Sequence, residues 1–293
     1  MNSGPLVFLA AFFALGASLC GFVLTPQIQI GRQPQETNRV NGAELYPQAR
    51  PGLARQGLDV YRAEGCAACH SQQVSQTGTM CDVVLTDAGT NQAGLVNALI
   101  QTGQGKSSPG QFLSGLPKPV LEGVDLDRAN SLASLLKSAG AKAAVSVVPV
   151  GPDIARGWGK RRTVAADYLF DYPVMAGSQR VGPDLANVGV RLPDANWQLR
   201  HLYAPRSEVK DSLMPPYRFL FEKRSIGRQP SPDALQLGPG FAPPQGFEIV
   251  PRPAARALVA YLSSLRADTP LFEAPLTVAS AAVSAAATNT PAK

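Results

Sequence analysis

The segment that most restricts what this chain can fold into is YRAEGCAACHSQQV, residues 61–74. It places two cysteines and a histidine in the order C-x-x-C-H, at Cys66, Cys69 and His70. Two thiols one helical turn apart can each add to a vinyl group of the same porphyrin, and the adjacent imidazole is then held below the iron as an axial ligand. The spacing predicts one covalently bound haem c. A redox C-x-x-C pair, a zinc half-site and chance are the alternatives.

The other cysteines and the other histidine do not favour these alternatives. A zinc site needs two further Cys or His ligands, and the chain offers only His201 and Cys81, neither in a paired spacing. If Cys66 and Cys69 carry haem, Cys20 and Cys81 remain, which does not indicate a disulfide framework.

Length and composition set the class of protein. A chain of 293 residues is long enough for about two domains. Its hydrophobic share of 45% is ordinary for a globular protein and too low for one that crosses a membrane many times. The net charge is +6, and the basic residues are scattered apart from RGWGKRR at 156–162, so nucleic acid is not expected as a partner.

The N-terminus carries an uncharged apolar run at residues 5–24, long enough to cross a bilayer. Three interpretations compete: a cleaved signal peptide, a lipoprotein signal ending at Cys20, and a retained anchor. A cleaved signal peptide needs basic residues before its apolar run, but no Lys or Arg precedes this one. Leu19 stands before Cys20, where a lipoprotein signal needs a small residue. We therefore expect residues 1–25 to be a retained transmembrane anchor.

The side of the membrane follows from the haem. Arg32 and Arg39 alone would suggest a cytoplasmic C-terminal side. Haem c, however, is attached outside the cytoplasmic membrane in bacteria, so we expect a protein of the bacterial inner membrane with the bulk of the chain in the periplasm. Residues 26–50 are polar and proline-bearing and predict a linker, and the Ala/Thr/Ser/Pro-rich residues 269–293 predict a disordered tail.

Two amphipathic helices are expected on either side of the chain's central part. Apolar residues recur at helical spacing just before the C-x-x-C-H segment and again in 251–268, where Pro253 stands near the start. In small cytochrome c domains the first and last helices cross, and Gly57 with Tyr261 resembles the contact of a small residue with an aromatic one found there.

The iron needs a sixth ligand or an open position. The chain offers these candidates: Met1, Met80, Met175, Met214 and His201. Met214 is preferred as the sixth ligand because Pro215 and Pro216 restrict the conformations of its loop. Tyr217 can pack against the porphyrin, and the loop precedes the final helix. The alternative for a lone methionine is core packing.

The segment between His70 and Met214 is much longer than a compact single-haem domain needs, which indicates an insertion at 80–148. Its pattern is strand, helix, helix, strand, helix, strand, with helices expected at 91–102, 108–114 and 125–138 and with Gly140 ending the last one. The fragments DVVLTDAG, PKPVLEGV and LLKSAGAKAAV resemble the C-terminal domain of the ribosomal stalk protein L7/L12 along its whole length.

The stalk domain recruits translation factors with a lysine-rich helix, but here the equivalent stretch TNQAGLVNALIQTGQGKSS is almost neutral. A periplasmic module also meets no ribosome. We expect the inserted domain to have a structural or docking role.

With the insertion set aside, three segments become continuous: GCAACHSQQV, DIARGWGKRRTVAADYLFDYPVMAGSQRVGPDLANVGVR and HLYAPRSEVKDSLMPPYRFLF. They closely resemble the mono-haem, membrane-anchored subunit of cbb3-type cytochrome c oxidases, over about 25–76 and 151–266. The departures from that family are the insertion and Ala204, where an asparagine is expected.

The resemblance implies a mostly α cytochrome c domain, discontinuous over 51–79 and 149–268, with one N-terminal transmembrane helix and an inserted small α/β domain. It implies His70 and Met214 as axial ligands, and Pro183 as the carbonyl that accepts a hydrogen bond from the His70 imidazole. Arg206 suits contact with a haem propionate or docking, with solvated surface charge as the alternative.

The function implied is one-electron transfer, from a second c-type cytochrome subunit or soluble cytochrome c to the catalytic haem-copper subunit. The chain would not itself bind oxygen. Two alternatives remain open: a cytochrome subunit of another reductase such as nitric oxide reductase, and a haem-containing binding protein whose inserted domain is the functional head.

Overall fold

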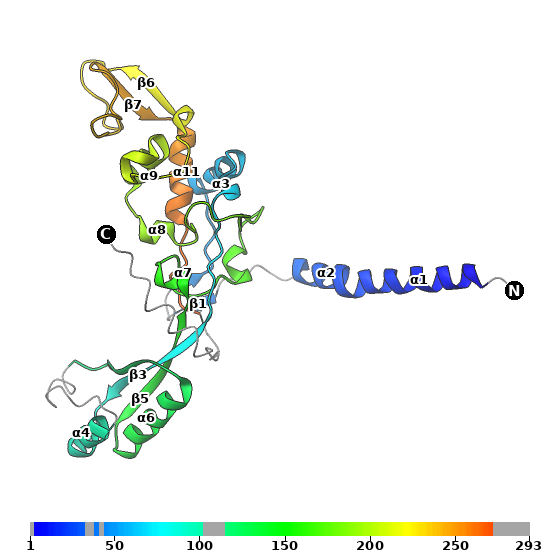
Figure 1. Ribbon diagram of the computed structural model, residues 1–293, viewed down its shortest axis with the longest axis vertical. Helices are drawn as coiled ribbons and strands as arrows, with labels where there is room; N and C mark the ends of the chain where they lie inside the picture. The colour runs from blue at the N-terminus through cyan, green and yellow to red at the C-terminus, as the bar shows by residue number, and fades with distance from the viewer. Residues whose placement is uncertain (1–2, 33–37, 41–43, 102–114, 272–293) are drawn as a thin grey trace.

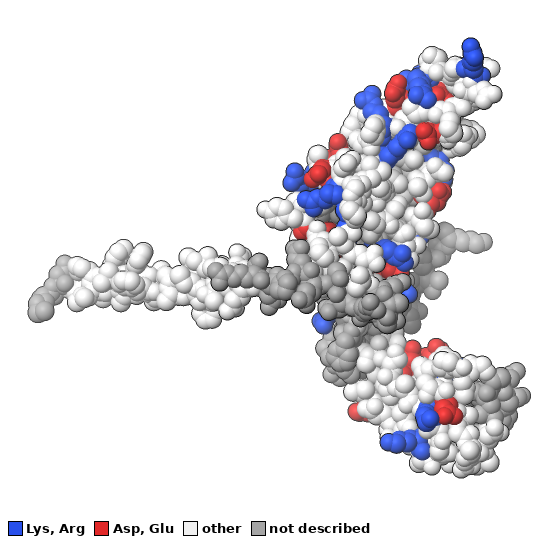
Figure 2. All heavy atoms as spheres, turned by 180° about the vertical axis from the view of Figure 1, so that it is seen from behind, with Lys and Arg blue, Asp and Glu red and all other residues white. Residues whose placement is uncertain are grey.

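The computed structural model describes residues 3–32, 38–40, 44–101 and 115–271. Figure 1 shows three parts: an N-terminal helix that projects to one side, an elongated helical body, and a small domain of strands and helices at one end of the body. Figure 2 shows, from behind, that lysines and arginines gather over the helical body, whereas the N-terminal helix is a white, uncharged rod.

The N-terminal helix is longer than the apolar run predicts. It consists of α1 (Gly4–Leu19), the π-helical turn η1 (Cys20–Leu24) and α2 (Thr25–Arg32), so it extends into the segment expected as a linker. Pro26 lacks an N–H, and the π turn lies directly before it. The Thr25 N–H and hydroxyl both donate to the Cys20 carbonyl, which keeps the helix continuous.

This helix is the candidate membrane span. The stretch Gly4–Gln29 has 26 residues and contains an 18-residue window with a mean hydropathy of 2.4, none of which is buried against the rest of the described structure. A helix of that length and composition, with nothing packed on it, suggests a membrane anchor.

The helical body is built on the crossing of α3 (Leu53–Ala63) and α11 (Pro253–Ser264). A Cβ placed on Gly57 would stand 1.9 Å from the Ala257 carbonyl oxygen and 2.6 Å from Cβ of Tyr261, so only glycine allows this approach. The rings of Tyr61 and Tyr261 lie 5.3 Å apart beside it. The expected contact between Gly57 and Tyr261 is therefore present.

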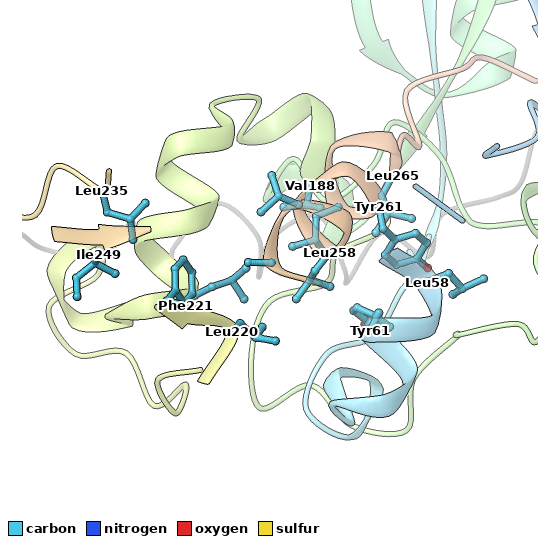
Figure 3. Close-up of a cluster of buried hydrophobic side chains, with 14 residues drawn as sticks. Leu58, Tyr61, Val188, Leu220, Phe221, Leu235, Ile249, Leu258, Tyr261 and Leu265 are labelled. Atoms are coloured by element: carbon cyan, nitrogen blue, oxygen red, sulfur yellow. The ribbon is translucent and has the colours of Figure 1, made fainter. Parts of the chain in front are cut away.

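Further short helices complete the body: η2 (Cys66–Ala68), α7 (Pro152–Ala155), η3 (Ala165–Tyr168), α8 (Val188–Arg191), α9 (Ala195–Tyr203), α10 (Pro205–Glu208) and η4 (Arg218–Leu220). Figure 3 shows the buried apolar cluster of the body, in which Val188 of α8 and Leu220 of η4 lie with side chains of α3 and α11.

Two small hairpins belong to this part of the chain. Strands β6 (Phe221–Ser225) and β7 (Phe247–Pro251) pair antiparallel at the end of the body far from the small domain. Strands β1 (Asn38–Val40) and β2 (Glu44–Tyr46) pair within the segment expected as a linker. The body is thus helical with added two-stranded ribbons.

The small domain contains β3 (Gly78–Asp87), α4 (Gln92–Gln101), β4 (Lys118–Val124), α6 (Leu126–Ser138) and β5 (Lys142–Val150). Its sheet has the antiparallel order β4-β3-β5. Asp125 caps α6 by accepting from the Arg128 N–H at 2.8 Å, and Gly140 follows the helix with φ of 85°. The helix expected at 108–114 lies outside the described residues.

The small domain has its own core. Its buried cluster includes Val83 and Leu85 of β3, Leu95 and Leu99 of α4, and Leu136 of α6, and it shares no member with the cluster of the helical body. The long strands β3 and β5, paired from Gly78↔Val150 to Asp87↔Lys142, join the two parts as a ribbon.

Candidate functional site: the C-x-x-C-H turn and its surroundings

The C-x-x-C-H turn follows directly from α3. Gly65 adopts φ of 69°, a left-handed conformation that suits glycine, and turns the chain from α3 into η2. The amide of His70 then donates to the Cys66 carbonyl at 3.0 Å, which places both thiols and the imidazole on one turn. Both thiols are free; Cys66 is half-buried and Cys69 is exposed.

The Cys66 thiol lacks the character of a redox-active cysteine. Burial raises the pKa of the Cys66 thiol to about 11. A redox-active C-x-x-C cysteine depends on a lowered pKa, because the thiolate is the reactive form. Cys66 instead packs against the apolar cluster of the body, as a thiol joined to an apolar ring would.

His70 is held by residues far along the chain. Its Nδ1 lies 2.8 Å from the Pro183 carbonyl oxygen, and since a carbonyl only accepts, the proton sits on Nδ1. The amide of Gly182 donates to the Cys69 carbonyl at 2.9 Å. Burial lowers the pKa of His70, and the hydrogen bond to Pro183 offsets part of that change. The imidazole is therefore neutral at physiological pH, with Nε2 left to bind a metal.

The side chains of Met214 and Tyr217 pack against the same apolar cluster as Cys66 of the C-x-x-C-H turn. Both are half-buried. Burial raises the pKa of Tyr217, and the Cys66 and Cys69 side chains lie within electrostatic reach of its phenol. Met175 packs against the same cluster, so it stays an alternative to Met214 as a ligand.

His201, the remaining nitrogen candidate, stacks on Trp197 with ring centroids 4.8 Å apart. Burial lowers the pKa of His201, and His70 lies within electrostatic reach of it. Its Nδ1 is buried and has no hydrogen-bond partner among the described residues. Such an atom is costly unless a bound group satisfies it.

Arg191 was not singled out by the sequence, yet it carries a second atom of this kind. Its Nε is buried without a partner in the described part of the chain, while its Nη2 donates to the Asp184 carbonyl at 2.8 Å. Burial lowers the pKa of Arg191. Arg206, by contrast, is exposed, and its Nε donates to the Ser212 carbonyl at 3.3 Å. No sequence signal separates a buried arginine from the many on the surface.

The donor set fits a haem c. Two free thiols one turn apart, a neutral imidazole with Nε2 available and a thioether in a neighbouring loop are the groups that hold such a cofactor. The unsatisfied nitrogens of Arg191 and His201 add donors for anionic groups at its edge.

One family of known proteins matches part of the chain. The family of cytochrome c oxidase mono-haem subunits, FixO, matches residues 146–235, a segment that contains Pro183, Arg206, Met214 and Tyr217. The match supports a relationship with the mono-haem subunit of cbb3-type oxidases and with it a single haem. His70 lies outside the matched segment, and its hydrogen bond to Pro183 joins the C-x-x-C-H turn to that segment.

A second likeness is to large ribosomal subunit protein bL12. The chain is 39% identical to the protein of Sulfurihydrogenibium sp. (strain YO3AOP1) over 64 residues, which is 22% of this chain and 50% of that protein. It is 40% identical to the protein of Corynebacterium aurimucosum over 65 residues, 22% of this chain and 51% of that one. The chain spans about half the length of the curated relatives it matches. This gives weak support to the stalk-like nature of the inserted domain.

Proposed function

We propose that this chain is a membrane-anchored c-type cytochrome. More specifically, it is the mono-haem electron-transfer subunit of a cbb3-type cytochrome c oxidase. The observation that carries the proposal is the 2.8 Å hydrogen bond between Nδ1 of His70, in the C-x-x-C-H turn, and the carbonyl of Pro183, within the segment matched by the oxidase subunit family.

Four side chains hold the cofactor in this proposal. Cys66 and Cys69 would form the thioether bonds, and His70 through Nε2 and Met214 through its sulfur would ligate the iron. When bound, haem c supplies one-electron exchange. A thioether ligand and apolar surroundings that include Tyr217 would raise the reduction potential and disfavour oxygen binding. The chain is then an electron carrier within the complex, whereas oxygen is reduced elsewhere.

The haem propionates would be bound by side-chain nitrogens of the protein. Arg191 and His201 each have one nitrogen without a partner among the described residues, so they are assigned to the propionates. Arg206 is exposed on α10 and suits docking on the catalytic subunit.

The uncharged helix Gly4–Gln29 anchors the chain in the bacterial inner membrane. The rest of the chain lies in the periplasm, where haem c is attached. The electron donor is a second c-type cytochrome, as another subunit or a soluble protein, and the acceptor is the haem-copper subunit. The inserted domain serves as a docking or structural module.

Purification of the tagged full chain from membranes of a bacterium that matures c-type cytochromes and makes a cbb3-type oxidase tests the proposal. The expected result is a haem-stained band that brings down the catalytic haem-copper subunit and takes up oxygen with reduced cytochrome c. Haem without any oxidase, or with the catalytic subunit of a nitric oxide reductase, would overturn the oxidase assignment. Absence of haem would overturn the cytochrome itself.

A further inference from the structure

Arg180 joins two carboxylates that the fold buries almost completely. Asp153 is 1% exposed and Asp184 is 0% exposed. Nη1 of Arg180 lies 2.8 Å from a carboxylate oxygen of Asp153, and its Nη2 lies 3.8 Å from one of Asp184. Its Nε donates to the hydroxyl of Ser71 at 2.9 Å.

Asp184 fastens the backbone that directly follows His70. The Ser71 hydroxyl donates to its Oδ2 at 2.5 Å, and the Gln73 amide donates to the same oxygen at 2.8 Å. In return, the Leu185 amide donates to the Ser71 carbonyl at 2.8 Å. These hydrogen bonds fix the backbone position of Ser71 and Gln73, directly after His70.

Asp153 accepts hydrogen bonds from the segment that connects the helical body to the small domain. The amide and the hydroxyl of Ser75 both donate to its Oδ2, at 2.8 and 2.6 Å. Two residues later, the Thr77 amide donates to the Val150 carbonyl at 2.9 Å, which starts the β3–β5 ribbon. Burial alone would raise the pKa of Asp153, but the hydrogen bonds from Ser75 and Arg180 outweigh it and lower the pKa, so the group is ionised at neutral pH.

We propose that Arg180 is a positioning residue that binds the segment after His70 to the root of the small domain and sets the electrostatic field at the iron. The inference rests on the proposed function, because it needs the haem on His70. Arg180 is 36% exposed and 2.8 Å from Asp153, whereas Arg156 is 58% exposed and 3.7 Å away, so Arg156 stabilises that carboxylate less. Without Arg180, the carboxylates of Asp153 and Asp184 lose their shared cation and the group gains net negative charge. Asp184 lies within electrostatic reach of His70, and negative charge there favours ferric over ferrous iron.

The test compares the full chain with Arg180→Gln, with Arg180→Gln/Asp153→Asn and with Arg228→Gln. The control residue Arg228 is an exposed arginine between β6 and β7. At pH 8, Arg180→Gln is expected to shift the one-electron equilibrium toward ferric iron at least tenfold, about 59 mV. The double variant should recover most of the shift, and the control should keep the wild-type potential. Hydrogen exchange of the amides at residues 71–77 should accelerate only in the two Arg180 variants.

Two results would overturn the inference while leaving the cytochrome intact. One is an unchanged potential in Arg180→Gln with haem bound; the other is an equal shift in the control. If Arg180→Gln does not retain haem, Arg180→Lys decides, since it keeps the charge but not the planar fork. Haem retained in Arg180→Lys, with near-normal potential and faster exchange, supports the positioning role, and haem lost there as well contradicts it.

Discussion

Gly182 lies flat against the imidazole of His70. A Cβ placed on Gly182 would stand 2.2 Å from Cε1 and 2.7 Å from Nδ1 of that ring. The next residue, Pro183, accepts the hydrogen bond from Nδ1. One face and one nitrogen of the ring are thus fixed by two consecutive residues, which leaves Nε2 as the ligating nitrogen in the proposed site.

Gly182→Ala is expected to displace His70, because a contact of 2.2 Å cannot be accommodated without moving the ring. Absorption spectra should show a weakened or mixed axial ligation, or less haem per chain. Gly227→Ala is the matched control, since a Cβ there meets nothing within 4 Å. Wild-type spectra in Gly182→Ala would contradict the role assigned to the glycine.

Cys66→Ala combined with Cys69→Ala should abolish haem staining on a denaturing gel, because both covalent links are then gone. Cys81→Ala serves as the control, since this buried thiol belongs to the core of the small domain. Staining that survives in the double variant would disprove covalent attachment at the C-x-x-C-H turn.

Met214→Ala should remove the thioether-to-ferric-iron absorption band and open the iron to carbon monoxide. Met214→His should keep a six-coordinate spectrum and lower the potential strongly, since imidazole favours ferric iron more than a thioether does. Met175→Ala is the comparison, because Met175 packs against the same cluster. If the band is lost in Met175→Ala and kept in Met214→Ala, the two assignments must be exchanged.

Gly57→Ala should lower the free energy of unfolding by about 1–3 kcal/mol, the usual cost of overpacking a well-packed interface. The added Cβ would meet the Ala257 carbonyl oxygen at 1.9 Å, and neither backbone can move far where α3 crosses α11. Thermal unfolding of the haem-bound protein in detergent measures the change. Gly238→Ala, with nothing within 4 Å of its Cβ, should leave the midpoint unchanged.

Deletion of residues 80–148, with Thr79 and Pro149 joined by Asn-Gly, should preserve the spectrum of His/Met ligation. These two residues already face each other across the ribbon, so a two-residue turn can close the gap. A longer deletion that also removes Asp153 should reduce haem incorporation, because Ser75 and Arg180 then lose their common partner. Equal haem loss in both deletions would contradict this division.

Local signals in the sequence predicted much of this architecture. The end of α6 at Gly140 and the close contact at Gly57 follow from residue type and helical spacing, whereas the N-cap at Asp125 was not singled out. Pro183 was found only through a family resemblance. The roles of Arg180 and Arg191 could not be predicted from the sequence, because their contacts depend on how distant segments fold together. Asp184 and Ser71, for example, are 113 positions apart.

The ribbon formed by β3 and β5 also predicts that the body tolerates foreign sequence at this point. Its strands leave the body already paired, and every hydrogen bond that fastens the root belongs to residues outside 78–150 or to the first pair of the ribbon. The body therefore offers a splice point at which another domain with adjacent antiparallel termini, such as a fluorescent or affinity module, can be exchanged without changing the site.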